Sequence, residues 1–202
     1  MNIRIFIKTH FEPLAITKKQ AILETALELF VSEGIDATSI RSIAEGADTA
    51  EGNIYRHFKS KNDLARTIFL NCATQFRNTL KETAAQGSGP EDQIEILIRT
   101  IFDFSFDYQK EFSYILIANH REEIITKEML SKPLPKDVFV EILQAGKERG
   151  IFELPEDPAI AVAWIIGMVQ RSIIFLRRNI TSLEPEKVID ETVRASLRML
   201  KG

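Results

Sequence analysis

The sequence predicts an all-α protein of about nine helices, in which a small N-terminal three-helix domain precedes a larger helical bundle. Three observations predict this class. Apolar residues recur at steps of three and four along most of the 202 residues. Helix caps, glycines and prolines divide the chain into segments of helical length. A hydrophobic content of 45% and a charged content of 27% are typical of a soluble globular protein.

An extension of sixteen residues, 1–16, precedes the first expected helix. Two interpretations of it remain open. It is either a loose tail, which an upstream start codon would explain, or an arm that reaches the minor groove of DNA with Arg4 and Lys8. The helix that follows is expected to begin at Thr17, where Thr17-x-x-Gln20 forms a capping-box pattern, and to end near Glu33.

The stretch from Thr38 to Phe58 has the dimensions of a helix-turn-helix. Thr38 or Ser39 can cap its first helix, and the turn falls at Gly46 and Asp48, which both tolerate a positive φ. The expected buried positions are Ile40, Ile43, Ala44, Ala47, Ile54 and Phe58. An ordinary αα-hairpin has the same periodicity, so spacing alone leaves DNA binding open.

The longer helices are predicted from their caps and prolines. One opens at Ser60 and runs through Leu80 to a glycine-containing break at 86–89. The others are expected over 90–108, 110–126 and 136–149, with two more that begin at Pro158 and Pro185, the last running to Met199.

Several submotifs follow one another without a gap from Thr17 to about Leu64. They are Ile22-Leu23-x-x-Ala26-x-x-Leu29-Phe30, then Gly34, then Ala37-Thr38-Ser39-Ile40-Arg41-x-Ile43-Ala44, then Gly52-Asn53-Ile54-Tyr55-Arg56-His57-Phe58-Lys59-Ser60-Lys61-x-x-Leu64. This composite resembles the N-terminal domain of the tetracycline-repressor (TetR) family. The resemblance implies a DNA-binding domain over 17–62, with its motif at 39–58, and an effector-binding and dimerisation domain over 63–202.

The resemblance also implies which residues touch DNA. The expected phosphate contacts are Thr38, Tyr55, His57, Lys59 and Lys61, and the expected base contacts are Arg41, Thr49, Ala50, Glu51 and Asn53. Asn53 can pair with adenine, and Glu51 can accept from cytosine N4. The chain departs from the family at the turn, where Asp48 replaces the usual glycine and Thr49 a small apolar residue.

Charge gives only local support for DNA binding. Residues 1–62 carry eight basic and eight acidic side chains, and the whole chain has a net charge of −3. Within 49–61, however, Arg56, Lys59 and Lys61 outnumber the single acidic residue, Glu51. A groove-binding protein needs positive charge only where phosphates lie, so we expect a modest electrostatic footprint.

No metal, cofactor or catalytic site is expected. The three histidines are far apart, and Cys72, the one cysteine, is interpreted as a packing residue in a reducing cytoplasm. A helical enzyme and an adaptor that binds only protein remain as alternatives.

The stretch from Ala159 to Val169 is apolar on every side, and its eleven residues are too few to span a bilayer. We expect its own core to cover one face and a second subunit the other, since the family pairs its last two long helices in a four-helix bundle. The expected homodimer interface comprises Trp164, Met168, Arg171, Phe175, Val193 and Leu197. The alternative is a helix central to one monomer's core.

An aromatic cluster over 102–114 suggests a small-molecule cavity, although phenylalanines at helical spacing also form ordinary core. The expected effector pocket comprises Phe102, Phe106, Phe112, Asn119, His120, Trp164 and Gln170. Together these features predict a cytoplasmic, dimeric repressor with no membrane contact. It would read an operator palindrome in double-stranded DNA and be released by a small apolar or aromatic effector. An activator, or a regulator without an effector, remains open.

Overall fold

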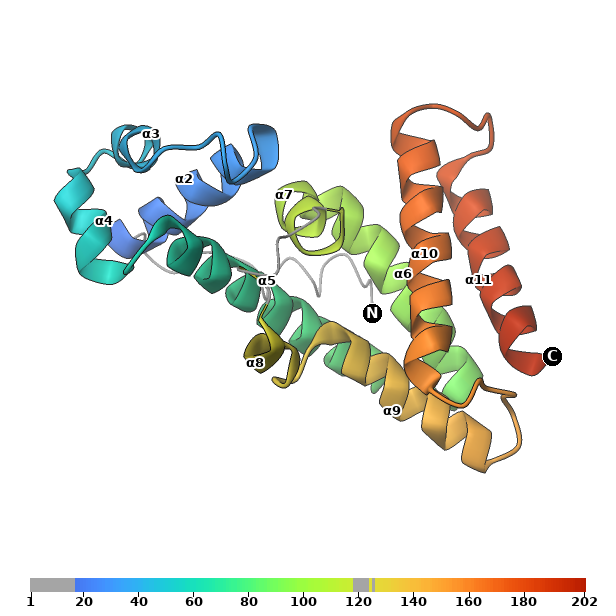
Figure 1. Ribbon diagram of the computed structural model, residues 1–202. Coiled ribbons are helices and arrows are strands. Elements are labelled where there is room, and N and C mark those ends of the chain that lie inside the picture. The colour runs from blue at the N-terminus through green and yellow to red at the C-terminus, as the bar shows by residue number, and fades with distance from the viewer. Residues whose placement is uncertain (1–16, 118–123, 125) are drawn as a thin grey trace. The chain divides into compact units, whose positions relative to one another are not determined.

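The computed structural model describes residues 17–117, 124 and 126–202, and every regular element among them is a helix (Figure 1). This confirms the all-α class. The chain divides into two compact units. The head unit contains the described residues of 17–75 and 108–133, and the bundle unit contains 76–107 and 134–202.

Three helices at the start of the head unit pack against one another: α2 (Lys18–Ser32), α3 (Ile40–Gly46) and α4 (Glu51–His57). Their caps follow the sequence. The Thr17 hydroxyl accepts from the backbone N–H of Gln20 at 3.1 Å, and Ser39 accepts from Ser42 at 2.9 Å. Ser39 therefore caps α3, and each cap satisfies a backbone donor that helical hydrogen bonding leaves free.

The head unit also contains the first part of α5 (Lys61–Ala84), together with α7 (Gln109–Phe112), a π-helix η1 (Ser113–Ile117) and α8 (Lys127–Leu130). Tyr114 ties η1 to this unit. Its phenol donates to the Ala65 carbonyl at 3.0 Å, and its ring stacks on Phe30 with centroids 6.3 Å apart. Burial raises the pKa of this phenol, which therefore stays protonated as a donor.

The single helix predicted over 110–126 is wrong. The chain instead forms the short α7 and then the wider turn of η1, and Thr126 is extended, with φ −85° and ψ 159°. Thr126 starts a new helix, because its hydroxyl accepts from the Met129 backbone N–H. The cap at Thr126 therefore begins a separate helix within the predicted span.

Cys72 on α5 lies in the same core and is 6% exposed. Burial raises the pKa of its thiol to about 12, so the thiol is protonated at neutral pH and unreactive as a nucleophile. This agrees with a packing role.

The bundle unit contains the end of α5, α6 (Pro90–Asp107), α9 (Pro135–Glu148), α10 (Pro158–Arg177) and α11 (Pro185–Lys201). A proline opens each of these four helices, since the missing N–H costs nothing at a first helical position. The sequence predicted this for α6, α10 and α11, whereas α9 begins at Pro135, one residue before its expected start. Helix α6 contacts α9, α10 and α11, and Phe104 stacks on Phe76 at a centroid distance of 4.3 Å.

Arg99 fastens α11 to α6. Its guanidinium bonds Glu95 on its own helix, Glu186 at 2.8 Å and Asp190 on α11. These contacts fix the orientation of α11, whose buried residues are Ile189, Thr192, Val193, Ser196 and Leu200. The opposite face of α11 is thereby left outside the core.

Helix α10 is long and apolar enough to cross a membrane by length and composition alone. The apolar stretch from Ala159 to Val169 lies within this helix of 20 residues. Its buried face is that of a core helix, formed by Ala161, Val162, Ile165, Val169 and Ile173. The other face exposes Ile160, Trp164 and Phe175 at 45%, 50% and 40%.

Candidate functional site

Helix α4 presents nearly all of its surface to solvent. Of its seven residues only Ile54 is buried, and Phe58 anchors the chain directly after it. Tyr55 is 55% exposed, and Arg56 and His57 are exposed beside it. A short helix held by two apolar residues, with donors on its outer side, has the form of a helix that enters a DNA groove.

The turn before α4 depends on Asp48, which has a φ of +48°. Glycine is the usual residue at this position in the resembled family, and aspartate is one of the few other residues that adopt this conformation. Lys18 supports the turn, since its ammonium donates to the Asp48 carbonyl at 2.9 Å and lies 3.6 Å from its carboxylate. Asp48 therefore adopts a backbone conformation that glycine also favours.

Replacing Asp48 by valine is expected to destabilise the head by about 1–2 kcal/mol, because a β-branched residue is strained at positive φ. Asp48→Gly should stay within about 1 kcal/mol of the parent, since glycine adopts this φ freely. Urea unfolding of both variants checks the prediction. Equal stability of the valine and glycine variants would contradict the role of backbone strain.

The expected base contacts lie on or next to α3 and α4. The Asn53 amide donates to the Thr49 hydroxyl at 2.9 Å, so these two side chains orient each other. Arg41 bonds Glu45 at 2.9 Å along α3, in a pair so exposed that a DNA ligand can displace it. Ala50 and Glu51 are exposed at the start of α4. The base contacts themselves stay predictions.

The expected phosphate contacts divide into two groups. Tyr55, His57 and Lys59 are exposed, whereas Thr38 is 1% exposed and its hydroxyl donates inward to the Gly34 carbonyl at 2.8 Å. In this conformation the Thr38 hydroxyl does not face solvent. Any contribution of this segment to phosphate binding must come from the neighbouring backbone and side chains.

Lys61 has a structural role that the sequence did not indicate. Its ammonium donates to the carbonyl oxygens of Asp36 at 3.1 Å and Thr38 at 2.6 Å, across a sequence separation of more than twenty residues. It thus ties the start of α5 to the loop before α3. An ammonium has three donors, so one remains for a phosphate.

Replacing Lys61 by methionine should destabilise the head by about 1–3 kcal/mol, because two charge-assisted hydrogen bonds are lost. It should also reduce the slope of log affinity for DNA against log salt by about one unit for each copy of Lys61. Urea unfolding and a salt titration of DNA binding measure the two effects separately. An unchanged slope would leave Lys61 a structural residue only.

The expected effector pocket stays a prediction, and its described residues differ in burial. Phe102 and Phe112 are fully buried and belong to different units, while Phe106 and Gln170 are partly buried. Trp164 instead lies on the outer face of α10. Asn119 and His120 lie outside the described residues. None of these residues lines the pocket between α10 and α11 or the pocket beside α2 and Asp48.

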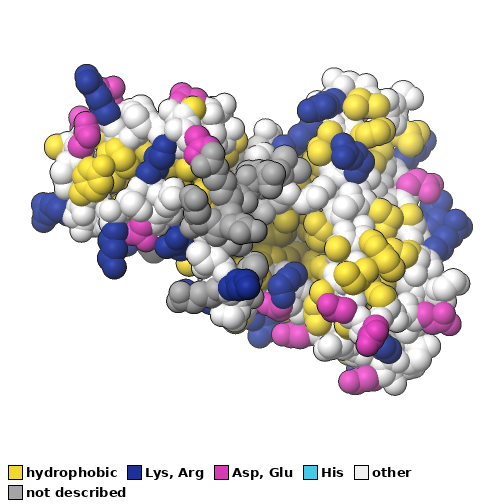
Figure 2. Space-filling view, viewed as in Figure 1, with side chains coloured by type: hydrophobic (Ala, Val, Ile, Leu, Met, Phe, Trp, Pro, Cys, Tyr) yellow, Lys and Arg dark blue, Asp and Glu magenta, His cyan; other side chains and the backbone are white. Residues whose placement is uncertain are grey.

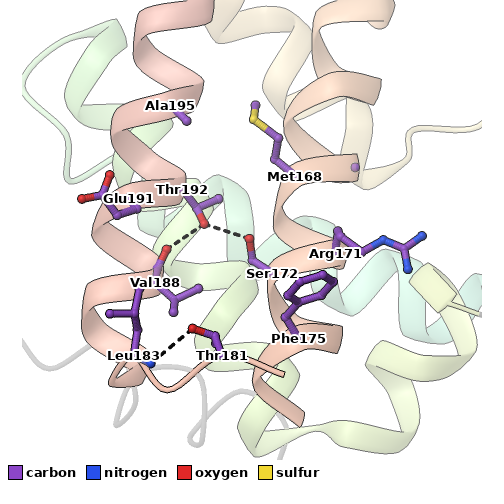
Figure 3. Close-up of a pocket in the computed structure, with 11 residues that line it drawn as sticks. Met168, Arg171, Ser172, Phe175, Thr181, Leu183, Val188, Glu191, Thr192 and Ala195 are labelled. Atoms are coloured by element: carbon purple, nitrogen blue, oxygen red, sulfur yellow. Dashed lines mark hydrogen bonds between the residues drawn. The ribbon is translucent and has the colours of Figure 1, made fainter. Parts of the chain in front are cut away.

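One of these pockets is an apolar groove between α10 and α11, with a cavity volume of about 590 Å³ (Figure 3). Hydrophobic side chains gather on the surface over these helices in the space-filling view (Figure 2). Its lining is Gly167, Met168, Arg171, Ser172 and Phe175 from α10, Thr181 and Leu183 from the loop, and Val188, Glu191, Thr192 and Ala195 from α11.

The groove agrees only in part with the expected subunit interface. Met168, Arg171 and Phe175 line it, and Trp164 is exposed one turn earlier on α10. On α11 neither expected residue lines the groove. Val193 is 5% exposed inside the protomer and Leu197 is partly buried. Val188 and Ala195, which sequence reasoning missed, form the apolar wall instead.

Comparison with known proteins places the head in a family. Residues 22–68 match the model of bacterial regulatory proteins of the tetR family. The chain is 30% identical over 149 residues to the probable HTH-type transcriptional regulator YttP of Bacillus subtilis (strain 168), covering 70% of this chain and 71% of that one. It is 26% identical to the HTH-type transcriptional repressor KstR2 of Rhodococcus jostii (strain RHA1), over 73% of this chain and 74% of that one.

Solved structures agree over nearly the whole chain. A putative tetR family regulator from Shewanella sp. PV-4 matches with a TM-score of 0.78 and 22% identity, covering 92% of this chain and 98% of that one. The fold, the exposed α4 and the sequence relatives therefore lead to one conclusion. This chain belongs to the TetR family of bacterial transcriptional regulators, which are DNA-binding proteins and not enzymes.

Proposed function

We propose that this regulator is a homodimeric repressor that reads an operator palindrome with α3 and α4 and leaves DNA when a small apolar or aromatic effector binds. The observation that carries the proposal is the exposed side of α4. Its donors Tyr55 and His57 project outward, while Ile54 and the adjoining Phe58 hold the helix to the core. A helix with an exposed polar side and a buried apolar side can enter the major groove while the head stays folded.

The roles on DNA follow from the positions of these side chains. Tyr55, His57 and Lys59, with the free donor of Lys61, would contact phosphates and fix the register. Asn53, Thr49 and Glu51, with Ala50 and Arg41, would contact base edges. The Asn53–Thr49 hydrogen bond supports this assignment, because it holds the amide in a defined orientation before DNA arrives.

The exposed apolar face of α10 supports a homodimer. A monomeric protein rarely leaves a tryptophan, a phenylalanine and an isoleucine exposed along one helix. A second copy placed on α10 and α11 would cover them, and a two-fold axis between the copies would present two heads to two half-sites. The alternative of a helix wholly inside one monomer does not account for Trp164 at 50% exposure.

Repression is supported by the names of relatives. KstR2 is named a repressor, as is a probable acrEF/envCD operon repressor of Escherichia coli (strain K12), which is 25% identical. IcaR of Staphylococcus aureus, also 25% identical, is named a negative transcriptional regulator. A cytoplasmic location follows from binding chromosomal DNA. The apolar face of α10 is then covered by protein and not by a membrane. A promoter–reporter assay separates repression from activation by the sign of the change.

An effector site is supported by the aromatic interior around α6, where Phe102 and Phe104 are fully buried. Apolar ligands of regulators occupy such interiors when the surrounding helices move apart. A solved structure of similar fold, FadR from Bacillus subtilis, was determined in complex with stearoyl-CoA, with a TM-score of 0.72 and 19% identity. We propose an effector of apolar or aromatic character for this chain as well.

The test is fluorescence anisotropy with labelled DNA from the region that flanks the gene, repeated with a panel of apolar and aromatic compounds. We expect salt-dependent, sequence-specific binding and an effector that both weakens it and raises the melting temperature. The two effects must be reciprocal, because coupling between two sites is mutual. A compound that stabilises the protein without any change in DNA affinity would contradict effector control.

A further inference from the structure

Arg171 is a charged residue on an apolar stripe. It lies on α10 between Met168 and Phe175, and all three line the groove between α10 and α11 (Figure 3). Arg171 is exposed and makes no ion pair or side-chain hydrogen bond with the described residues. A guanidinium carries five donors, so covering this surface with apolar groups alone would leave them unsatisfied. Whatever covers the groove must therefore supply an acceptor.

The groove contains a carboxylate of its own, on its other wall. Glu191 on α11 bonds Arg194 of the same helix at 2.7 Å, in a pair whose side chains are more than half exposed. A carboxylate accepts several hydrogen bonds, so Glu191 retains acceptor sites. In Figure 3 the side chains of Arg171 and Glu191 extend away from each other, toward opposite rims of the groove.

A hydrogen bond between α10 and α11 shows that Arg171 and Glu191 lie at the same height along the two helices. The hydroxyl groups of Ser172 and Thr192 lie 3.0 Å apart and join α10 to α11. Arg171 and Glu191 are the chain neighbours of these residues. The groove therefore has the Arg171 guanidinium on its α10 rim and the Glu191 carboxylate, which also bonds Arg194, on its α11 rim at the same height along the helices.

Under two-fold symmetry, the positions of these two charges indicate how a second copy is oriented. If a second copy faces the groove and the two-fold axis runs parallel to the helices, the α10 rim of each copy lies against the α11 rim of its partner. If the axis runs perpendicular to the helices, α10 lies against the partner's α10 and α11 against the partner's α11. Like charges then face one another. Like charges in contact oppose association, so the charge layout favours the first arrangement.

We propose that the occupant of this groove is a second copy of the chain, oriented so that Arg171 of each copy pairs with the partner subunit's Glu191. Two such pairs form in each dimer, because the interface is isologous. They set the register of the apolar contacts and select a copy of the same chain over relatives with other charges at these positions. The proposal rests on the proposed homodimer and adds its orientation and its specificity.

The experiment uses charge reversal in two separate chains, R171E and E191R. Each variant alone would place two like-charged contacts in its own dimer, and we expect its dissociation constant to rise about 100-fold, roughly tenfold for each contact. Mixed together, the two variants regain both opposite-charge pairs, since one chain carries two acids and the other two arginines. Native mass spectrometry separates the heterodimer by mass, and sedimentation measures its affinity.

We expect the mixture to form heterodimers with an affinity within about threefold of the parent, since tenfold per contact is restored. The matched controls are Lys147→Glu and Glu141→Arg, which reverse exposed charges on α9 outside the groove and should leave dimerisation unchanged. Single variants that dimerise like the parent, or a mixture that stays monomeric, would overturn the pairing alone. A parent chain that is monomeric at high concentration would overturn the homodimer as well.

Discussion

Replacing Tyr55 and His57 together by alanine should lower operator affinity by about 10,000-fold or more while leaving the melting temperature nearly unchanged. Each side chain would lose a hydrogen bond to a charged phosphate, worth about 1.5–3 kcal/mol, and a dimer loses two of each. Neither side chain belongs to the core, and alanine favours a helix at least as well as the residues that it replaces. Anisotropy on operator DNA and thermal unfolding measure the two quantities.

The matched control changes Asn78 and Lys81 to alanine, two exposed residues of α5 that lie away from α3 and α4 in the sequence. This variant should bind DNA within about threefold of the parent, because surface substitutions away from a site rarely exceed about 0.5 kcal/mol. Loss of affinity in both double variants would point to a general electrostatic effect. Unchanged affinity in the Tyr55 and His57 variant would contradict the proposal that α4 lies in the DNA interface.

Replacing Gly146 by alanine should destabilise the bundle unit by about 1–3 kcal/mol, which is the range for overpacking a tight core. A Cβ atom at this position would lie 2.2 and 2.5 Å from two ring carbons of Phe152, whose side chain is 3% exposed. The chain turns sharply here, and the Gly146 carbonyl accepts from the backbone N–H of Ile151 at 2.9 Å. The ring is therefore held against α9 and cannot easily move away.

The control is Gly52→Ala on α4, where a Cβ atom would meet nothing within 4 Å. There the substitution should stabilise by about 0.5–1 kcal/mol, since alanine is the better helix former. Urea unfolding distinguishes the two signs. In a Phe152→Ala background the Gly146→Ala cost should disappear, because the clashing ring is gone. An undiminished cost in that background would contradict the steric explanation.

The helix starts were predictable because they depend on residues next to one another in the sequence. Thr17 caps α2, and Pro158 and Pro185 open their helices where the sequence placed them. The region after Tyr108 was not, and there Tyr114 of η1 donates to the Ala65 carbonyl, 49 residues away. Periodicity alone does not reveal a contact of that length.

In the candidate site, too, features set by local sequence were predictable and features set by tertiary contacts were not. The tolerance of Asp48 for positive φ was predictable from its chemistry, and its φ of +48° confirms it. The inward hydroxyl of Thr38 and the bonds from Lys61 to the loop before α3 were not, since both depend on tertiary contacts. On α11, amphipathic spacing indicates an apolar face but does not say which neighbour covers it. Val193 accordingly faces the protomer's own core.

The most direct test of the central claim, that α3 and α4 read a palindromic operator, is a hydroxyl-radical footprint on the DNA flanking the gene. The proposed dimer predicts two protected patches related by two-fold symmetry, with centres about one helical turn, or about 10 base pairs, apart or a multiple of it. The Tyr55 and His57 double variant should lose both patches at the same protein concentration. Uniform protection along the DNA, or a pattern that the double variant retains, would contradict the claim.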